Sequence, residues 1–167
     1  MSLRTMLQDA MGLAGCPISD SDFMRYINLG MRDLEKFDTA KVRDTQVINC
    51  TDASLWYAMD HAIGFKKVVD SNGFYYPYFS LDNNQIQFAH TGSFTLHFWI
   101  PNTKITAMTG TLTIDSSYEM TLSKYAAYMA KKDPDLFQDY LNDAILTNKN
   151  LKGNVNKNRK VYARPFR

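Results

Sequence analysis

Catalytic signatures are missing from this sequence of 167 residues. It has no GxGxxG, GxxxxGK[ST], GxSxG or HExxH pattern. Its three histidines, His61, His90 and His97, lack the spacing of metal ligands. Asp60 and His61 could form an acid–base pair, but neighbouring residues on a strand point to opposite faces. We therefore expect a protein that is not an enzyme and that binds no cofactor and no metal.

Cysteine is scarce, and long apolar runs are absent. Cys16 and Cys50 lie far apart and form no CxxC pattern, so we expect reduced thiols in an intracellular protein. Polar residues interrupt the longest uncharged stretch, so we expect no segment that spans a membrane and no membrane partner. Hydrophobic residues still make up 45% of the chain and aromatic residues 13%, which is enough to build one globular domain.

Acidic residues are absent from the C-terminal end of the chain. The net charge is only +2, yet residues 152–167 contain six basic residues. Residues 1–151 therefore hold 13 basic and 17 acidic residues, a net charge of −4. The small total describes a mildly acidic body with a basic tail, which excludes a protein that is basic over its whole surface.

Apolar residues at helical spacing predict four helices, two at each end of the chain. The apolar stripe of the first helix starts at Leu3, and this helix ends at Gly15-Cys16-Pro17. The second helix begins at Ser19 or Asp20. The third begins at a capping box, Ser116 with Glu119. The last begins with Asp133 before Pro134 and is predicted to stop at Gly153.

Short aromatic and β-branched runs separated by turn residues fill the middle of the chain. They predict an antiparallel meander closed into a small sandwich or barrel. Asn72-Gly73 is a favoured hairpin turn, and Pro77 indicates an edge strand or a bulge. The predicted strands are Val47-Ile48, Leu55–Met59, Phe65–Val69, Phe74–Phe79, Ile86–Phe88 and Phe94–Ile100.

The expected fold is therefore α+β in a single domain. A bundle of about four helices comprises residues 1–40 and 112–152, because each apolar helix stripe must find a partner. An antiparallel β module at 42–101 is inserted between the two halves, and residues 153–167 form an extended basic C-terminal arm.

Two further groups of residues are candidate contact surfaces. Asp135, Asp139 and Asp143 recur every four residues and share one face of the last helix, which favours a solvated or partner-facing acidic stripe over a carboxylate site. The run that includes Tyr75, Tyr76 and Tyr78 could stack nucleic-acid bases, but few cations are interleaved with the rings. Core or interface aromatics are the better interpretation, so both groups are candidates for an interface with another subunit or a partner protein.

The C-terminal tail combines aromatic and apolar residues with cations. Such a mixture is typical of a docking arm that folds on a partner, and the alternative is a merely solvated tail. The predicted arm residues are Lys157, Arg159, Lys160, Val161, Tyr162, Arg164, Phe166 and Arg167.

The order and spacing of several segments resemble the head-to-tail adaptor (connector) proteins of tailed bacteriophages. The segment Phe23–Asn28 through Leu34 resembles the opening helix of that family. Leu55–Asp60 resembles its strand entry, although the usual proline near Met59-Asp60 is absent. Gly92–Pro101 resembles a later strand, and Tyr118–Tyr140 resembles the paired C-terminal helices.

The resemblance implies a structural virion protein with no catalytic role. Such adaptors form homo-oligomeric rings, usually of twelve copies, at the neck between capsid and tail, after assembly in the host cytoplasm. The helices and the C-terminal arm would bind the portal protein, and the β module would face outward or toward a tail or nozzle protein. Double-stranded DNA would pass through the lumen without sequence-specific binding, and an acidic body would not retain its phosphates.

An alternative function is a nucleic-acid-binding module that uses the basic tail and the aromatic strand. It predicts DNA binding that salt weakens and that neutralising Lys157, Arg159 and Lys160 abolishes. A small enzyme is the weakest hypothesis, because no catalytic constellation is present.

Overall fold

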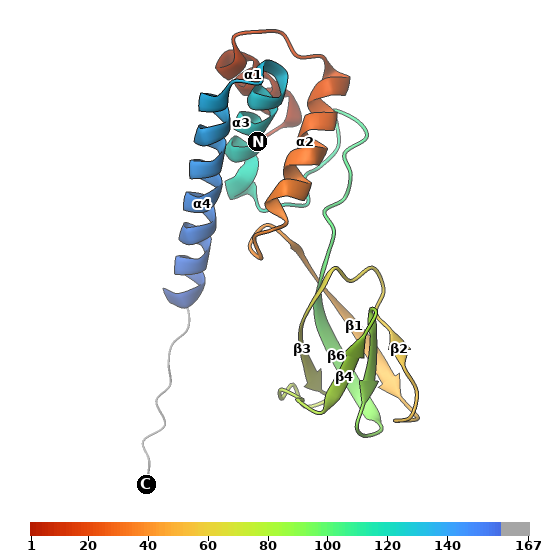
Figure 1. Ribbon diagram of the computed structural model, residues 1–167. Coiled ribbons are helices and arrows are strands. Elements are labelled where there is room, and N and C mark those ends of the chain that lie inside the picture. The colour runs from red at the N-terminus through yellow and green to blue at the C-terminus, as the bar shows by residue number, and fades with distance from the viewer. Residues whose placement is uncertain (158–167) are drawn as a thin grey trace. The chain divides into compact units, whose positions relative to one another are not determined.

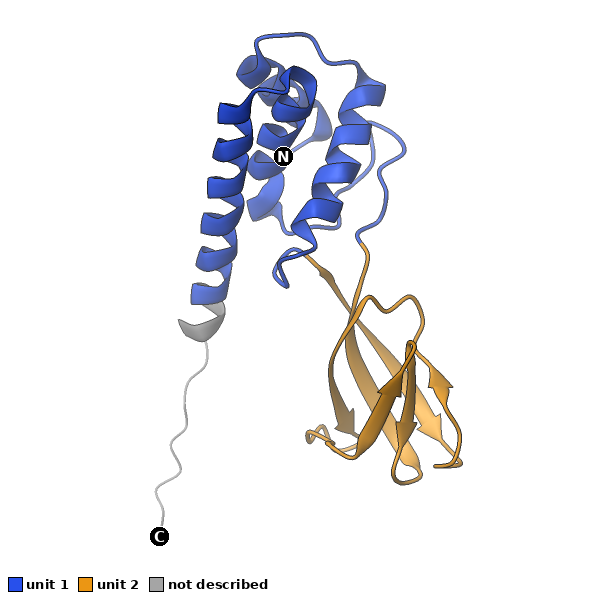
Figure 2. Ribbon diagram, viewed as in Figure 1, with its two compact units in different colours: residues 1–40, 102–167 blue, residues 41–101 orange. Residues whose placement is uncertain are grey.

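The computed structural model describes the backbone of residues 1–157 and the side chains of residues 1–153. Its α-helices are α1 (Leu3–Ala14), α2 (Asp20–Leu34), α3 (Glu119–Lys131) and α4 (Pro134–Lys157), shown in Figure 1. The chain divides into a helical unit, residues 1–40 with 102–167, and a β unit, residues 41–101 (Figure 2). Four helices and antiparallel sheets confirm the predicted α+β class.

The caps at the start of α1 and α2 and at the end of α1 follow the local sequence. The Ser2 hydroxyl accepts a hydrogen bond from the Thr5 amide at the start of α1 (3.2 Å), and Ser19 caps α2 by accepting from the Asp22 amide (3.1 Å). Gly15 ends α1 with φ +65°, a left-handed conformation that glycine adopts without steric cost, and its N–H donates to the Met11 carbonyl.

The start of α3 differs from the predicted capping box. Ser116–Tyr118 forms a 3₁₀ turn, η1, and Asp115 caps it by accepting a hydrogen bond from the Ser117 amide at 2.9 Å. Glu119 is the first residue of α3, and Ser116 is not its cap. An aspartate one position upstream caps as well as a serine does, and the tight turn places Tyr118 in the core.

The last helix begins as predicted but continues beyond its predicted stop. The Asp133 carboxylate accepts from the Asp135 amide at 3.0 Å, as expected of an N-cap before Pro134. The helix then runs through Gly153 to Lys157. Glycine in a helix interior costs about 1 kcal/mol relative to alanine, which weakens a helix without ending it. The predicted arm at 153–167 therefore contains the last turn of α4, and residues 158–167 lie outside the described part of the chain.

In the helical unit α1, α2 and α4 all pack on α3. Gly30 allows α2 to approach α3 closely, because a Cβ there would lie 2.9 Å from Leu122 Cδ2. Two fully buried tyrosines have hydrogen-bonded hydroxyls. Tyr118 Oη lies 2.7 Å from Thr39 Oγ1, and Tyr140 donates to Asp33. The helical core thus includes large aromatic rings whose polar ends have partners.

The β unit consists of two three-stranded antiparallel sheets and not of one meander. One sheet has the order β1-β6-β3 and the other β2-β5-β4, so the first and last strands of the unit are neighbours. The elements are β1 (Val42–Cys50), β2 (Tyr57–Ala58), β3 (Gly64–Asp70), β4 (Phe79–Asp82), β5 (Gln85–Phe88) and β6 (Gly92–Ile100). This unit has its own core, which includes Val68, Ile86, Phe88, Phe94, Leu96 and Phe98.

Three predicted strands are wrong in extent, and one of them, Val47-Ile48, is only part of the longer β1. Of Phe74–Phe79 only Phe79 belongs to a strand, β4, and Tyr75 makes a single bridge to Val69. Pro77 explains the break, because proline cannot donate to a sheet ladder. The predicted strand Leu55–Met59 shortens to β2, because Leu55 closes a turn that begins at Asp52. The Asp52 carboxylate organises this turn by accepting from the Ser54 amide at 2.8 Å.

The turns of the β unit follow their residue chemistry. Asp70 Oδ1 accepts from the amides of Asn72 and Phe74, and Gly73 has φ +80°, which confirms the predicted Asn72-Gly73 turn. Asn83 and Asn84 both have positive φ between β4 and β5, as a two-residue hairpin loop requires.

Candidate interaction surfaces

The three aspartates predicted to share a face of α4 have different environments. Asp135 and Asp139 are exposed. Asp143 is half-buried, and its carboxylate accepts from Thr121 Oγ1 at 2.6 Å and pairs with Lys124 Nζ at 3.1 Å. Asp143 therefore joins α4 to α3, so the outward-facing acidic stripe consists of Asp135 and Asp139.

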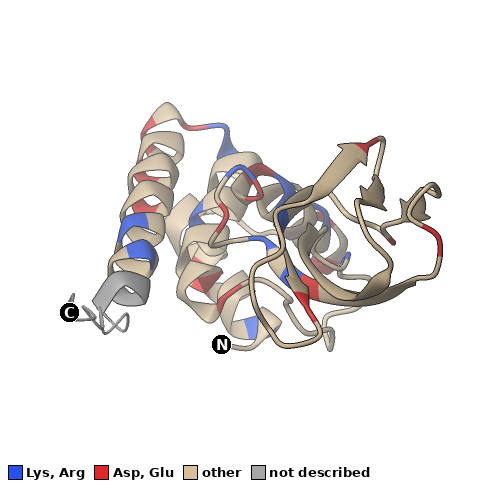
Figure 3. Cartoon of the chain, turned by 90° about the horizontal axis from the view of Figure 1, so that it is seen from below, with Lys and Arg blue, Asp and Glu red and all other residues tan. Residues whose placement is uncertain are grey.

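The exposed side of α4 also carries apolar residues. Ile145 is 57% exposed and Leu146 is 56% exposed, in a helix whose opposite side buries Tyr140. Figure 3 shows acidic residues on the first half of α4 and basic residues on its second half. This distribution complements the helix dipole. We call Asp135, Asp139, Ile145 and Leu146 the outer face of α4.

A groove of about 490 Å³ lies on the other flank of the helical unit, between α2 and the segment after Pro101. Arg25, Arg32 and Lys104 line it together with the apolar side chains of Met24, Leu29 and Ile105. No acidic side chain lines it. We call this feature the α2 groove; it combines an apolar base with three positive charges.

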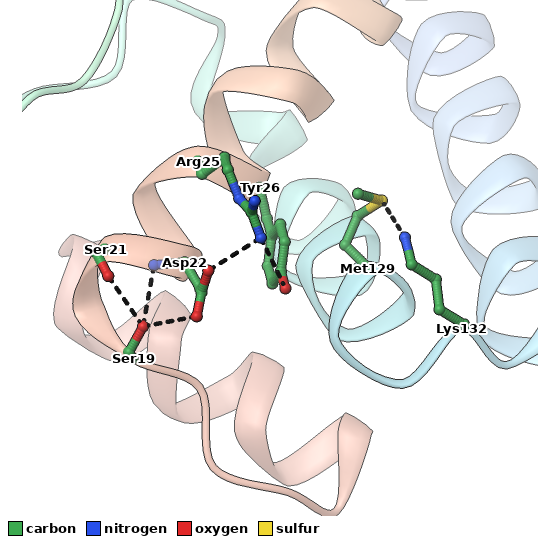
Figure 4. A network of polar contacts seen from close by, with 7 residues as sticks. All are labelled: Ser19, Ser21, Asp22, Arg25, Tyr26, Met129 and Lys132. Atoms are coloured by element: carbon green, nitrogen blue, oxygen red, sulfur yellow. Dashed lines mark hydrogen bonds and ion pairs between the residues drawn. The ribbon is translucent and has the colours of Figure 1, made fainter.

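The guanidinium of Arg25 is held at one end of this groove. Its Nη2 lies 3.0 Å from Asp22 Oδ1, and the guanidinium lies 5.2 Å from the centre of the Tyr26 ring (Figure 4). Arg32 and Lys104 are exposed, and neither makes an ion pair with any residue that the structure describes. These two cations can therefore meet an anionic partner without losing an existing one.

Asn28 shapes the same groove and was not identified as important from its residue type. Its Nδ2 donates to the Ile105 carbonyl at 2.8 Å, and its Oδ1 accepts from the Ile105 amide at 2.7 Å. One side chain thus holds the segment that carries Lys104 against α2. The position falls in the segment that resembles the adaptor family, but only the fold brings Ile105 to it.

The predicted aromatic surface of the β unit is divided between surface and core. Tyr75 is 63% exposed and Tyr78 is 61% exposed. Tyr76 packs against the core, with its ring centre 4.5 Å from that of Phe94, and its hydroxyl lies 3.0 Å from His90 Nδ1. Tyr75 and Tyr78 can contact a partner, whereas Tyr76 is largely structural.

Large apolar side chains are exposed elsewhere on the β unit as well. Of the fifteen that are exposed among the described residues, eight lie in this unit: Val47, Leu55, Trp56, Ile63, Phe74, Tyr75, Tyr78 and Leu81. Large contiguous areas of exposed apolar surface mark interaction sites, although scattered apolar residues are ordinary.

The basic residues of the β unit gather on one sheet. Its four cations are Lys41 and Arg43, at and beside the start of β1, and Lys66 and Lys67 on β3. Arg43 and Lys66 both lie over the Trp99 ring, 5.3 and 5.4 Å from its centre. Trp99 points to the opposite side of β6 from Leu96 and Phe98 and is only 7% exposed, so this outer sheet face presents cations over a buried ring.

His97 lies on the same outer face. Partial burial lowers its pKa, and the nearby positive charges of Lys67 and Lys66 lower it further. The imidazole is therefore neutral at neutral pH. Neutral His97 therefore adds no further positive charge beside Lys66 and Lys67.

The described residues, 1–157, hold no cluster of metal-ligating side chains. No three His, Cys, Asp or Glu side chains in that range lie close enough to hold a metal ion. Cys16 and Cys50 are free thiols. No helix of the described chain is sufficiently long and apolar to cross a membrane.

The predicted docking arm is mostly beyond the described residues. Lys157 is the last residue of α4. The other predicted arm residues, Arg159, Lys160, Val161, Tyr162, Arg164, Phe166 and Arg167, lie outside the described range.

Comparison with known proteins found no match: no protein-family model fits the chain, and no curated protein is significantly similar to it.

Proposed function

We propose that this chain is a structural adaptor that assembles into a ring, of about twelve copies by the resemblance above, at the neck of a tailed bacteriophage. The ring joins the portal to a tail or nozzle protein and surrounds the DNA exit channel without catalysing a reaction. Its place is the virion, after assembly in the host cytoplasm. The order of sequence segments that resemble this family motivates the proposal.

The observation that carries the proposal is exposed apolar surface in both units. A chain that works alone gains nothing from Ile145 and Leu146 more than half exposed on α4, or from Phe74 and Tyr75 more than 60% exposed on the β unit. A ring subunit needs separate contacts to its neighbours and to the layers above and below. Two units, each with its own core and its own exposed apolar residues, suit that task.

Charge supports the same function. The acidic body would not retain the phosphates of DNA that slides through a lumen, because each phosphate contact adds affinity. The basic residues concentrate after Leu151, where they can meet a protein partner. In this proposal the arm from Asn158 to Arg167 binds the portal.

The experiment mixes the purified chain with its cognate portal ring and determines the mass and image of the complex. A closed ring of this chain on the portal is expected. Truncation after Lys157 should abolish portal binding and leave α4 intact, because the helix ends at that residue. A control in which Lys149 and Lys152 become glutamine should keep binding. A chain that stays monomeric at high concentration and does not bind the portal would contradict the proposal.

A nucleic-acid-binding module is the second candidate, and the cationic face around Trp99 favours it. Arginine and lysine beside an exposed sheet face can contact phosphates, and the basic tail would add to them. This candidate predicts retention of DNA at low salt that Lys66→Glu and Lys67→Glu together remove. Asp44→Lys on β1 is the control, because it adds positive charge to the same sheet. An equal loss of DNA retention in this variant would show that the loss does not come from removing positive charge.

A further inference from the structure

We propose that neighbouring copies in the ring meet through two different surfaces of the helical unit. The outer face of α4 on one copy docks in the α2 groove of the next. The inference rests on the proposed ring and names the contact that builds it. The occupant of the groove is thus a second copy of this chain.

The two surfaces lie on different flanks of one rigid bundle. Both α2 and α4 pack on α3, and Figures 1 and 3 show α4 at one side of the helical unit. Gly30 faces α3 from α2, while Tyr140 and Ala144 are buried on the inner side of α4. Contacts between two unlike surfaces repeat head to tail, and they close into a ring when the rotation between copies allows it.

The charges of the two surfaces are opposite and otherwise unused. Arg32 and Lys104 in the groove make no ion pair within residues 1–153, and the same is true of the Asp135 and Asp139 carboxylates. Every charged residue lining the groove is basic. Complementary charges of this kind fix the register of an interface and disfavour wrong pairings. One such pairing is the contact of two α4 helices through their acidic first halves.

Apolar contacts supply the attraction that exposed ion pairs do not. Leu29 is 38% exposed at the groove, beside Met24, and Ile145 and Leu146 project from α4. Arg25 and Arg32 are seven positions apart, as are Asp139 and Leu146, and each pair spans about 10 Å along its helix. The part of the outer face from Asp139 to Leu146 therefore matches the α2 span in length, so acidic and apolar positions of α4 can contact basic and apolar positions of α2 together.

Disulfide cross-linking tests the pairing directly. Leu29→Cys and Leu146→Cys are placed on the same chain, and the protein is oxidised gently at high concentration. A head-to-tail contact predicts a ladder of dimers, trimers and larger species up to the closed ring. Mixing the two single variants should give only one cross-linked dimer. Wild type, with Cys16 and Cys50, and Leu13→Cys on α1 serve as controls and should give no ladder.

The outcomes separate this inference from the proposed function. Cross-linking of Leu146→Cys with itself would mean that α4 pairs with α4 and would overturn the inference. Closed rings without any Leu29–Leu146 cross-link would also overturn it and leave the adaptor proposal standing. A ladder in a chain that never binds a portal would support the contact and count against the adaptor function.

A charge exchange provides an independent measurement. Arg32→Glu or Asp139→Lys alone should weaken self-association at least tenfold, measured by sedimentation or native mass spectrometry. The two changes on one chain should restore it, because each interface then contains an exchanged pair. Arg4→Glu on α1 is the matched control and should have no effect. Unchanged association in both single variants, or no recovery in the double variant, would overturn the proposed contact.

Discussion

The helical unit and the β unit bury their aromatic residues in different ways. In the helical unit Tyr118 and Tyr140 are fully buried, and each hydroxyl has a hydrogen-bond partner. In the β unit the rings of Phe88 and Phe94 stack with centres 4.3 Å apart in the core, while Phe74 is 71% exposed. Among the described residues the β unit exposes four aromatic side chains, Trp56, Phe74, Tyr75 and Tyr78, whereas the helical unit exposes one, Phe137.

The difference teaches which unit depends more on partners. A segment of about 60 residues buries a smaller fraction of its surface than a larger unit does. The β unit covers residues 41–101, and it exposes more of its large apolar side chains. Its surface is therefore better suited to contacts made on assembly. Both tryptophans, Trp56 and Trp99, belong to this unit, so tryptophan fluorescence follows its unfolding while helical circular dichroism follows the helical unit.

The largest expected effect comes from Tyr140→Ala. It removes a fully buried ring and its bond to Asp33, which should destabilise the helical unit by about 3–5 kcal/mol. The midpoint of the circular dichroism transition should fall, and the fluorescence midpoint should not. Equal shifts of both signals would mean that the two units unfold together and would contradict the separation into two cores. Tyr140→Phe is the milder control, since it keeps the ring.

Leu96→Ala is the corresponding change in the β unit. Leu96 is fully buried on β6, the central strand of its sheet, and truncation should cost about 2–5 kcal/mol. Here the midpoint of the fluorescence transition should fall, and the midpoint of the helical circular dichroism transition should not change. A loss of helical signal at the same denaturant concentration would refute independent stability.

Asn28→Ala tests how firmly the segment after Pro101 is held. The buried Ile105 amide and carbonyl would lose their partners, which should cost about 1–3 kcal/mol in the helical unit. Asn28→Asp keeps an acceptor for the Ile105 amide and should cost less. Denaturant titration followed by circular dichroism measures both, and an aspartate variant weaker than the alanine variant would contradict this account.

Adjacent tyrosines distinguish surface from core in the β unit. Tyr75→Ser should change stability by no more than about 0.5 kcal/mol, because the side chain is mostly exposed. Tyr76→Ser should cost clearly more, since it removes the contact with Phe94 and the bond to His90. If Tyr75→Ser also weakens binding of a tail-side protein while stability is unchanged, Tyr75 belongs to an assembly surface. Fluorescence unfolding curves provide the comparison.

The smallest expected effect is a pH dependence of the β unit through His97. The pKa of this histidine is lowered in the folded chain by burial and by Lys67 and Lys66, so the unfolded chain binds its proton more readily. The stabilising contribution is complete above the usual histidine pKa of about 6.5 and is lost as pH falls through the lowered folded value. His97→Gln should flatten this dependence in fluorescence unfolding curves measured between pH 7.5 and 5. An equally steep decline in the variant would assign it to another group.

Local residue patterns predict helix ends well where a single residue decides them. Ser19, Gly15 and Asp133 act at the positions expected from capping and backbone freedom. Gly153 and Ser116 do not, because a glycine only weakens a helix and because Ser116 lies inside a 3₁₀ turn that Asp115 caps before α3 begins. Strand extent is predicted less well, since pairing partners far along the chain decide it, as the break at Pro77 shows.

The candidate surfaces divide in the same way. The acidic spacing on α4 is visible in the sequence, but the burial of Asp143 against Thr121 and Lys124 is not. The α2 groove combines Arg32 with Lys104, which are 72 residues apart by their numbers, and no local pattern relates them. Asn28 lies in the segment that resembles the adaptor family, but no local pattern indicates its hydrogen bonds with Ile105.

The sequence by itself determined the α+β class, the four helices, the β segment between them and the concentration of basic charge at one end. Periodicity, caps and composition are local properties, so they can be read along the chain. Only the tertiary structure decided that β1 pairs with β6, that Tyr76 is partly buried while Tyr75 is exposed, and that Arg32 and Lys104 line the same groove. Those outcomes depend on which distant segments bury one another, because burial and charge proximity arise only when the chain packs.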